Sequence, residues 1–157
     1  MPELLKLDRA LVEQWLEESR VVYEDCGHCE GVHLSALKSI EGAIDSRLFL
    51  ERFGLLLTTE LEVRPMALFA VAADLGRLNM EFPTLKIFLD IVDDATPQLV
   101  IAGVLPASPG LTLQQFAAFV AMTMEATRQV AGECLRLDYL FPSGDGSTQG
   151  GAPSALH

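Results

Sequence analysis

Residues 44–65 read IDSRLFLERFGLLLTTELEVRP, and this stretch decides the fold. A period of two runs over residues 44–50 and again over 53–63, which predicts two β-strands with residues 51–52 as the turn between them. Pro65 then suits the first turn of a helix, where its missing N–H leaves no hydrogen bond unmade. The stretch therefore predicts a β-hairpin followed directly by a helix.

The chain before this stretch predicts another helix and another hairpin. Over residues 8–20 the apolar residues fall on one stripe and the glutamates lie off it, the 3.6-residue pattern of an amphipathic helix. Residues 21–23 and 32–34 are short β-like runs. Residues 26–31 between them include two glycines, which allow a tight reversal. These runs predict a hairpin whose tip carries cysteines.

The chain after the stretch continues with a helix and two strands. The helix is predicted to run from Pro65 to about Asn79. Its buried stripe is predicted to comprise Leu68, Val71, Ala72, Leu75 and Leu78. Residues 85–91 alternate, and residues 99–105 form an apolar run bounded by prolines. They predict two paired strands, the second of them central or covered on both faces.

A capping box opens the last predicted helix. Thr112 is followed three residues later by Gln115, the spacing at which the two side chains satisfy each other's backbone N–H groups. The face predicted to be buried comprises Phe116, Phe119, Val120, Thr123, Thr127, Val130, Ala131 and Cys134. The order helix, four strands, helix, two strands, helix predicts an α+β fold, with three helices packed against a twisted antiparallel sheet.

The length predicts one domain, over residues 1–142. Half of the 157 residues are hydrophobic, enough to fill a single core. Residues 143–157 are rich in glycine and serine and are predicted to form a flexible tail. Apolar residues beyond the main helical stripes include Met66, Phe69, Met122 and Met124. Because three helices cannot all bury such residues on one small sheet face, we expect a homodimer.

Charge and hydropathy exclude several kinds of partner. The net charge is -11 and the pI is near 4.5, so the protein surface is negative and would repel a phosphate backbone. We therefore expect no nucleic-acid partner. The apolar runs at 67–73 and 99–105 are shorter than the roughly 20 residues that cross a bilayer, so we expect no membrane partner. The N-terminus lacks the basic start and apolar stretch of a secretory signal. We therefore expect a cytoplasmic protein.

Cys26 and Cys29 form a thiol pair with a chemically suggestive spacing. In disulfide-exchange enzymes the first cysteine of such a pair opens a helix, whereas here the strand-like residues 32–34 follow. Asp25 and Glu30 would also raise the thiol pKa values and oppose thiolate formation. The ordinary interpretation is that the pair fills a turn with both thiols reduced. A redox pair is the alternative.

The same two cysteines could supply half of a zinc site. His28 or His33 would be a nearby further ligand. The chain has no second cysteine pair of this spacing, although a dimer could pool the pairs of its two copies. Cys134 falls on the apolar face of the last predicted helix, where a small buried thiol is ordinary. We therefore expect no cofactor and no metal, with structural zinc as an alternative.

Motifs of known enzymes are absent from the sequence. It contains no G-x-S-x-G motif of serine hydrolases, no glycine-rich phosphate-binding loop and no H-E-x-x-H motif of zinc proteases. We therefore expect a protein without catalytic or cofactor-binding residues. The segment that contains Asp90, Asp93 and Asp94 lacks the glycine and the final glutamate of an EF-hand calcium loop. The simpler interpretation is that these carboxylates keep the end of a strand in contact with water. Arg64 and Asp74 could each anchor a buried polar network, or Arg64 could tie a strand end to a carboxylate.

Several separated blocks of residues carry a family resemblance. They are Cys26 and Cys29 with HL at 33–34, EVRP at 62–65, AADL at 72–75 with Asn79, FLD at 88–90, DD at 93–94, and QFA at 115–117. With these blocks in this order, the chain resembles the YbjN family of bacterial proteins, described as sensory transduction regulators.

The resemblance has implications for fold and function. It implies a fold like that of type III secretion chaperones, which are small acidic dimers that bind extended segments of partner proteins. We therefore expect a non-catalytic cytoplasmic regulator or chaperone-like adaptor, a homodimer that acts by binding a protein. A thiol redox or zinc-dependent switch at Cys26 and Cys29 is the alternative.

Overall fold

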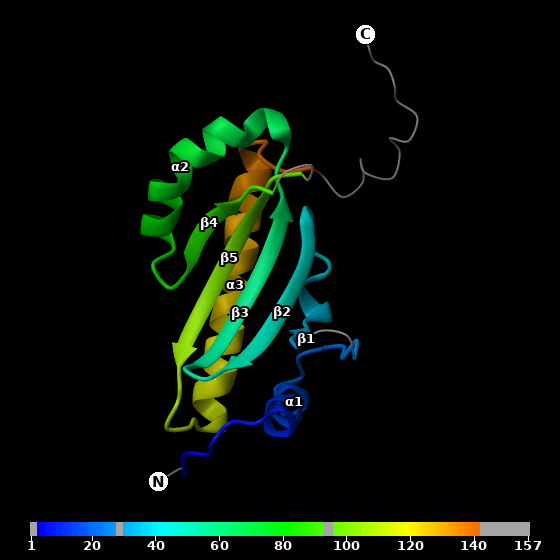
Figure 1. The fold of residues 1–157 in the computed structure, drawn as a ribbon, viewed down its shortest axis with the longest axis vertical. Helices are drawn as coiled ribbons and strands as arrows, with labels where there is room; N and C mark the ends of the chain where they lie inside the picture. Colours follow the sequence, from blue (N-terminus) through cyan, green and yellow to red (C-terminus); the bar gives the residue numbers. More distant parts are fainter. Residues whose placement is uncertain (1–2, 28–29, 93–95, 142–157) are drawn as a thin grey trace.

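The structure is a computed structural model that describes residues 3–27, 30–92 and 96–141. Five antiparallel strands form one sheet in the order β1-β2-β3-β5-β4 (Figure 1). The strands are β1 (Val32–His33), β2 (Ala43–Glu51), β3 (Gly54–Glu62), β4 (Lys86–Asp90) and β5 (Gln98–Pro106). The helices are α1 (Arg9–Glu18), α2 (Leu68–Glu81) and α3 (Leu113–Arg136), with 3-10 turns at Ser35–Leu37 and Pro65–Ala67. The predicted α+β class with an antiparallel sheet and three helices is confirmed.

The long helix α3 crosses one face of the sheet (Figure 1). Its start is the predicted capping box: Gln115 N–H donates to Thr112 Oγ1 at 3.1 Å and Thr112 N–H donates to Gln115 Oε1 at 2.9 Å. The predicted apolar face of this helix is buried except for Phe119, which is half-buried. At Gly103 on β5 a Cβ atom would lie 2.6 Å from Thr123 Cγ2, so α3 packs directly on the strand backbone there. We call this side of the sheet the covered face.

The other two helices lie at the margins of the sheet. The first, α1, begins at its cap Asp8 and buries Val12, Trp15 and Leu16. The Trp15 ring lies 5.4 Å from the Phe116 ring of α3, so α1 closes one end of the core. The second, α2, lies along the outer edge of β4 and buries only Val71 and Leu78 (Figure 1).

Asn79 fixes α2 to the sheet edge. Its side-chain amide donates to the carbonyl oxygens of Leu75, at 2.8 Å, and of Ile87, at 3.0 Å. Its Oδ1 atom accepts the Ile87 N–H at 2.9 Å. The side chain thereby pairs with the outward backbone groups of an edge strand, which otherwise invite pairing with another chain.

Three sequence predictions are wrong in detail. Residues 21–23 are not a strand: only Glu24 forms an antiparallel bridge with His33, and the Val22 carbonyl is taken up by the Ala36 N–H at 3.2 Å. Ala72 is exposed rather than buried, because α2 touches an edge and not a face of the sheet. Met124 is buried, whereas Met66, Phe69 and Met122 are exposed as expected.

Other boundaries differ slightly from the predictions. The helix α2 ends at Glu81 rather than near Asn79, and it begins at Leu68, after a separate 3-10 turn at Pro65–Ala67. The strand β5 is central, as predicted, with a helix on one of its faces. The predicted tail, residues 143–157, lies outside the described residues, and so its flexibility stays a prediction. Within the described ranges no helix is long and apolar enough to cross a membrane.

Candidate functional site

The face of the sheet opposite α3 carries no helix within the described parts of the chain (Figure 1). Side chains on this open face come from alternate positions of β2, β3, β5 and β4. They comprise Asp45, Arg47, Phe49, Leu56, Thr58, Glu60, Glu62, Val100, Ala102, Val104, Lys86, Phe88 and Asp90. Their neighbours on the covered face, such as Leu57 and Ile101, are almost fully buried.

One end of the open face is apolar. The strand register places Phe49 opposite Leu56, and Leu56 opposite Val104, as a continuous row across three strands. Val104 is 48% exposed, while Phe49 and Leu56 are half-buried. Phe88, on β4, is 38% exposed but lies in another row, beside Val100 and Glu60. Solvent therefore reaches a strip of apolar surface near the turn between β2 and β3, rather than one isolated side chain.

The other end of the open face is acidic. Asp45 stands directly opposite Glu60, an arrangement in which like charges destabilise a strand pair. Arg47 lies between them: its guanidinium donates to Glu60 Oε1 at 3.0 Å and lies 3.4 Å from Asp45 Oδ2. Farther along, Glu62, Gln98 and Asp90 form the last row. The face thus runs from an apolar end to an end with more carboxylates than cations.

His33 connects this face to the cysteine loop. Its Nδ1 atom lies 3.0 Å from Asp45 Oδ1, and its ring also contacts the Cys26 side chain. Hydrogen bonding to Asp45 first, and to Cys26 second, raises the pKa of His33 above its ordinary value. Cys26 itself is exposed. Cys26, His33 and Asp45 therefore form one polar line that leads onto the open face.

The structure tests the thiol and zinc hypotheses only in part. Cys29 and His28 lie outside the described residues. Among the residues that are described, no group of three or more His, Cys, Asp or Glu side chains could hold a metal ion. Cys134 is buried, and burial raises the pKa of its thiol to about 12, which makes it an inert core residue as predicted.

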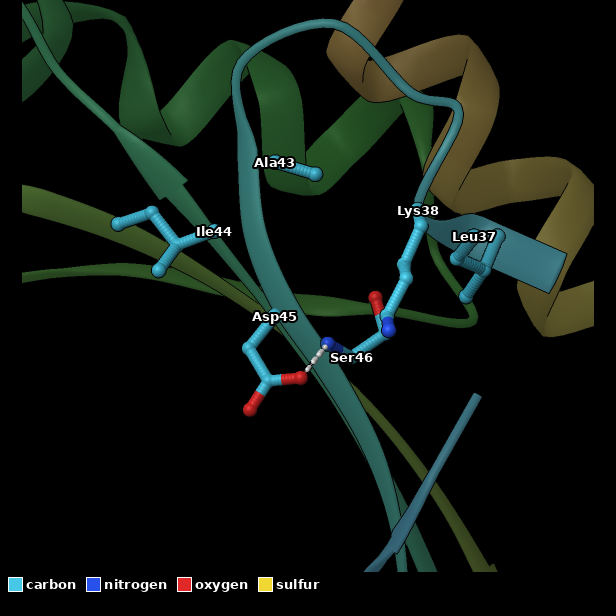
Figure 2. A pocket seen from close by; sticks show the side chains of 6 residues that line it. All are labelled: Leu37, Lys38, Ala43, Ile44, Asp45 and Ser46. Carbon is cyan, nitrogen blue, oxygen red and sulfur yellow. Dashed lines mark hydrogen bonds between the residues drawn. The ribbon is translucent and has the colours of Figure 1, made fainter. Parts of the chain in front are cut away.

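A small pocket adjoins Asp45 where β2 shifts register between Ala43 and Asp45 (Figure 2). Its lining comprises Leu37, Lys38, Ala43, Ile44, Asp45 and Ser46. The Asp45 carboxylate turns back to accept the Ser46 N–H at 2.9 Å (Figure 2). At about 240 Å³ the pocket falls below the roughly 300–1,000 Å³ of ordinary small-molecule sites. We interpret it as a recess that accompanies the bulge rather than as a cofactor site.

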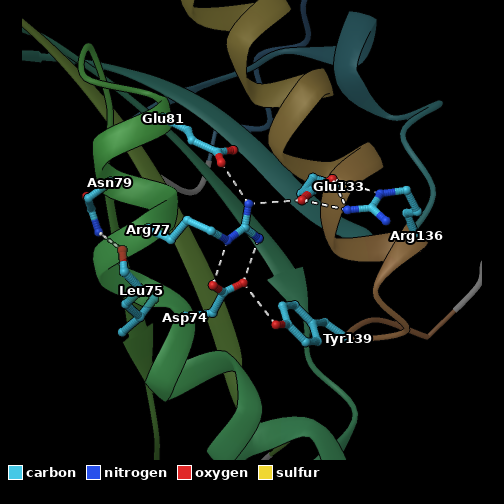
Figure 3. Close-up of polar contacts among 8 residues, drawn as sticks. All are labelled: Asp74, Leu75, Arg77, Asn79, Glu81, Glu133, Arg136 and Tyr139. Carbon is cyan, nitrogen blue, oxygen red and sulfur yellow. Dashed lines mark hydrogen bonds and ion pairs between the residues drawn. The ribbon is translucent and has the colours of Figure 1, made fainter.

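Asp74 anchors a polar network, as one of the sequence alternatives proposed. Both carboxylate oxygens accept hydrogen bonds from Arg77 at 2.7 Å, and the Tyr139 hydroxyl donates to Oδ2 at 2.9 Å (Figure 3). Arg77 also reaches Glu133 on α3 at 3.1 Å. The Arg77 hydrogen bonds, followed by that of Tyr139, lower the pKa of Asp74. The network ties α2 to α3 and is structural in character.

The other sequence candidates have simple structural roles. Arg64 does not join the Asp74 network; its guanidinium pairs with the Asp138 carboxylate, so it ties the end of a strand to a carboxylate as the alternative predicted. Asp90 ends β4. Asp93 and Asp94 lie outside the described residues.

The open face itself cannot be located from the sequence periodicity. Period two showed that Phe49, Leu56 and Val104 share faces with their neighbours, but it did not show which face α3 would cover. The signal was present in β5, where Gly103 lies among large residues and marks the side that a helix approaches closely.

Comparison with known proteins assigns the chain to a family. The YbjN family, described as "Putative bacterial sensory transduction regulator", matches residues 8–136. The uncharacterized protein YbjN of Escherichia coli K12 is 34% identical over 134 residues, covering 85% of each chain; a protein of the same name from Shigella flexneri matches to the same extent. A crystal structure of YbjN, "a putative transcription regulator from E. coli", matches with a TM-score of 0.86 at 32% identity, covering 89% of this chain and 99% of that one. The chain belongs to the YbjN family.

Proposed function

We propose that this protein is a non-catalytic regulator of the chaperone-like adaptor type, which binds an extended segment of another protein across its open sheet face. The carrying observation is the row of Phe49, Leu56 and Val104, which is left partly exposed on a sheet face that no described helix covers. A segment laid across these strands would bury that row and present alternate side chains to it.

The charge of the face defines the chemistry of the partner. The acidic end holds the four carboxylates of Asp45, Glu60, Glu62 and Asp90 against the two cations Arg47 and Lys86, and the whole chain carries a net charge of -11. Such a surface attracts a segment that combines apolar and basic residues and repels a phosphate backbone. We therefore propose that regulation, the role named for the E. coli structure, proceeds through a protein rather than through contact with DNA, and in the cytoplasm.

A photo-crosslinking experiment in cells tests this proposal. A photoreactive amino acid replaces Val104 on the open face, and in a matched variant it replaces Met122 on α3, which is exposed to 63%. We expect a discrete crosslinked protein from position 104 that is missing from position 122. Crosslinks that are equal at both positions, or missing from position 104, would contradict binding at the open face.

A thiol switch is the second candidate, favoured by the contact of Cys26 with His33. An imidazole held by Asp45 and protonated beside a thiol stabilises the thiolate, the reactive form of cysteine. Reversible oxidation of Cys26 and Cys29 would then change the charge at the margin of the open face. If the crosslink from position 104 is unchanged in a Cys26→Ser, Cys29→Ser variant under both oxidising and reducing conditions, this candidate fails while the binding proposal stands.

A further inference from the structure

The outer face of α2 is the most exposed apolar surface among the described residues. Met66, Phe69 and Met80 are 92%, 85% and 83% exposed, more than any other large hydrophobic side chain there. Fully burying one side chain of this size is worth about 1.5–3 kcal/mol relative to leaving it in water. Nothing within the described parts of the chain covers this surface.

The exposed residues form one stripe along the helix. Phe69, Ala73, Gly76 and Met80 recur every three or four residues, so they share one side of α2, and Met66 in the preceding 3-10 turn continues the same spacing. All five are exposed, and the side opposite to them carries the buried Val71 and Leu78. We call these five residues the α2 stripe. It has large side chains at its ends and small residues in its centre.

Gly76 is not required by the fold of a single chain. A Cβ atom built there would meet no atom within 4 Å, and the residue lies inside a regular helix. Glycine in a helix interior costs about 1 kcal/mol relative to alanine. Close approach of another backbone or ring from outside the chain would explain why the position has no side chain.

The α2 stripe is an uncharged surface on a strongly acidic protein. The stripe itself contains no ionised side chain, although the whole chain carries a net charge of -11. Arg77, at its margin, is drawn aside by Asp74 at 2.7 Å, Glu81 at 3.0 Å and Glu133 at 3.1 Å (Figure 3). Two copies of an acidic protein repel each other least where they meet through a surface of this kind.

We propose that the α2 stripe binds the α2 stripe of a second copy of this chain, with the two helices antiparallel and the two-fold axis close to Ala73. In this arrangement Met66 of one copy meets Met80 of the other, and each Phe69 ring lies over the other copy's Gly76. A parallel arrangement would instead set Phe69 against Phe69 and leave two glycines facing an empty space. The stripe is therefore self-complementary in one orientation, as a symmetric interface requires.

Sedimentation and light scattering test whether the stripe joins two copies. At micromolar concentrations we expect twice the 17.1 kDa mass of one chain. A Phe69→Glu variant should be monomeric with an unchanged circular dichroism spectrum, since this side chain contacts solvent in the single chain. Its melting temperature should fall only by the stabilisation that association gives the wild type, and it should no longer depend on protein concentration. Val22→Glu, at a residue 63% exposed elsewhere on the surface, should remain dimeric. A monomeric wild-type protein, or a dimeric Phe69→Glu variant, would overturn the proposal.

Disulfide crosslinking tests the orientation, in a background that carries Cys26→Ser and Cys29→Ser. We expect Ala73→Cys to crosslink with itself, and a mixture of Phe69→Cys with Gly76→Cys to form the mixed disulfide in preference to either homodimer. Self-crosslinking of Phe69→Cys in preference to the mixed product would overturn the antiparallel arrangement. This proposal does not depend on the open sheet face, so its failure would leave the proposed function in place, and the reverse also holds.

Discussion

The two faces of one sheet differ in what their side chains do. On the covered face, aliphatic residues such as Leu57 and Ile101 are sealed beneath α3, and the polar pair Ser46 and Thr59 is buried with a mutual hydrogen bond of 2.9 Å. On the open face these strands carry partly exposed apolar residues and ion pairs together with the buried Val100 and Ala102, and His33 lies at its margin on β1. We infer that the covered face supplies stability, and that the open face is free to carry recognition.

The largest expected effect comes from truncating neighbouring leucines on opposite faces of β3. Leu57→Ala removes a fully buried side chain beneath α3 and should lower the free energy of unfolding by about 2–5 kcal/mol. Leu56→Ala, one residue away on the open face, should cost no more than about 1 kcal/mol because its side chain already meets solvent. Urea unfolding of the two variants measures the difference, and equal losses would mean that the open face is part of the core.

Two glycines sharpen the same comparison. Gly103→Ala places a methyl group 2.6 Å from Thr123 Cγ2 beneath α3 and should destabilise the fold by about 1–3 kcal/mol. Gly132→Ala, on the exposed side of α3 where a Cβ meets nothing, should stabilise it by about 0.5–1 kcal/mol. The two shifts in melting temperature should have opposite signs, and a tolerated Gly103→Ala would argue against close packing of α3 on β5.

The Asp74 network connects α2, at the edge of the sheet, to α3 on the covered face. Asp74→Asn keeps the shape but weakens the bonds to Arg77 and Tyr139, so we expect a loss of about 1–2 kcal/mol near neutral pH. Because folding lowers the pKa of Asp74, its contribution is present above the unfolded pKa of about 3.9 and is lost as pH falls through the folded value. Chemical denaturation of both proteins across that range checks the trend; a difference that grows on acidification would contradict it.

The smallest expected effect belongs to His33 on the open side. Its pKa is raised in the folded protein, so its contribution to stability is complete below the unfolded pKa of about 6.5 and is lost as pH rises through the folded value. The advantage of wild type over His33→Gln should therefore be larger at mildly acidic than at alkaline pH, and should stay under about 1 kcal/mol because the pair is partly exposed. An advantage that increases with pH would show that His33 is neutral in the fold.

Sequence periodicity predicted the elements better than it predicted their placement. The capping box of Thr112 and Gln115 and the stripe of α3 could be found because both depend on residues close together in the chain. Placement depends on long-range contacts. Alternation along β3 makes Leu56 and Leu57 equally good core residues until α3 covers one face. Ala72 fits the helical stripe equally well, but it is exposed because α2 lies at a sheet edge.

The polar line of Cys26, His33 and Asp45 was only partly visible in the sequence. The cysteine spacing was clear, but the contact of His33 with Asp45 follows from the register in which the two-residue strand β1 meets β2. A register set by so short a pairing leaves no periodic signal, so only the three-dimensional structure joins these residues.

Binding of a protein segment across the open face is the central claim, and Val104→Arg tests it most directly. A photoreactive amino acid at Phe88 reports the bound partner in cells, while urea unfolding of the same variant reports its stability. We predict that Val104→Arg abolishes the crosslink from position 88 and changes the free energy of unfolding by no more than about 0.5 kcal/mol. An undiminished crosslink in a stably folded variant would contradict the assignment of recognition to this face.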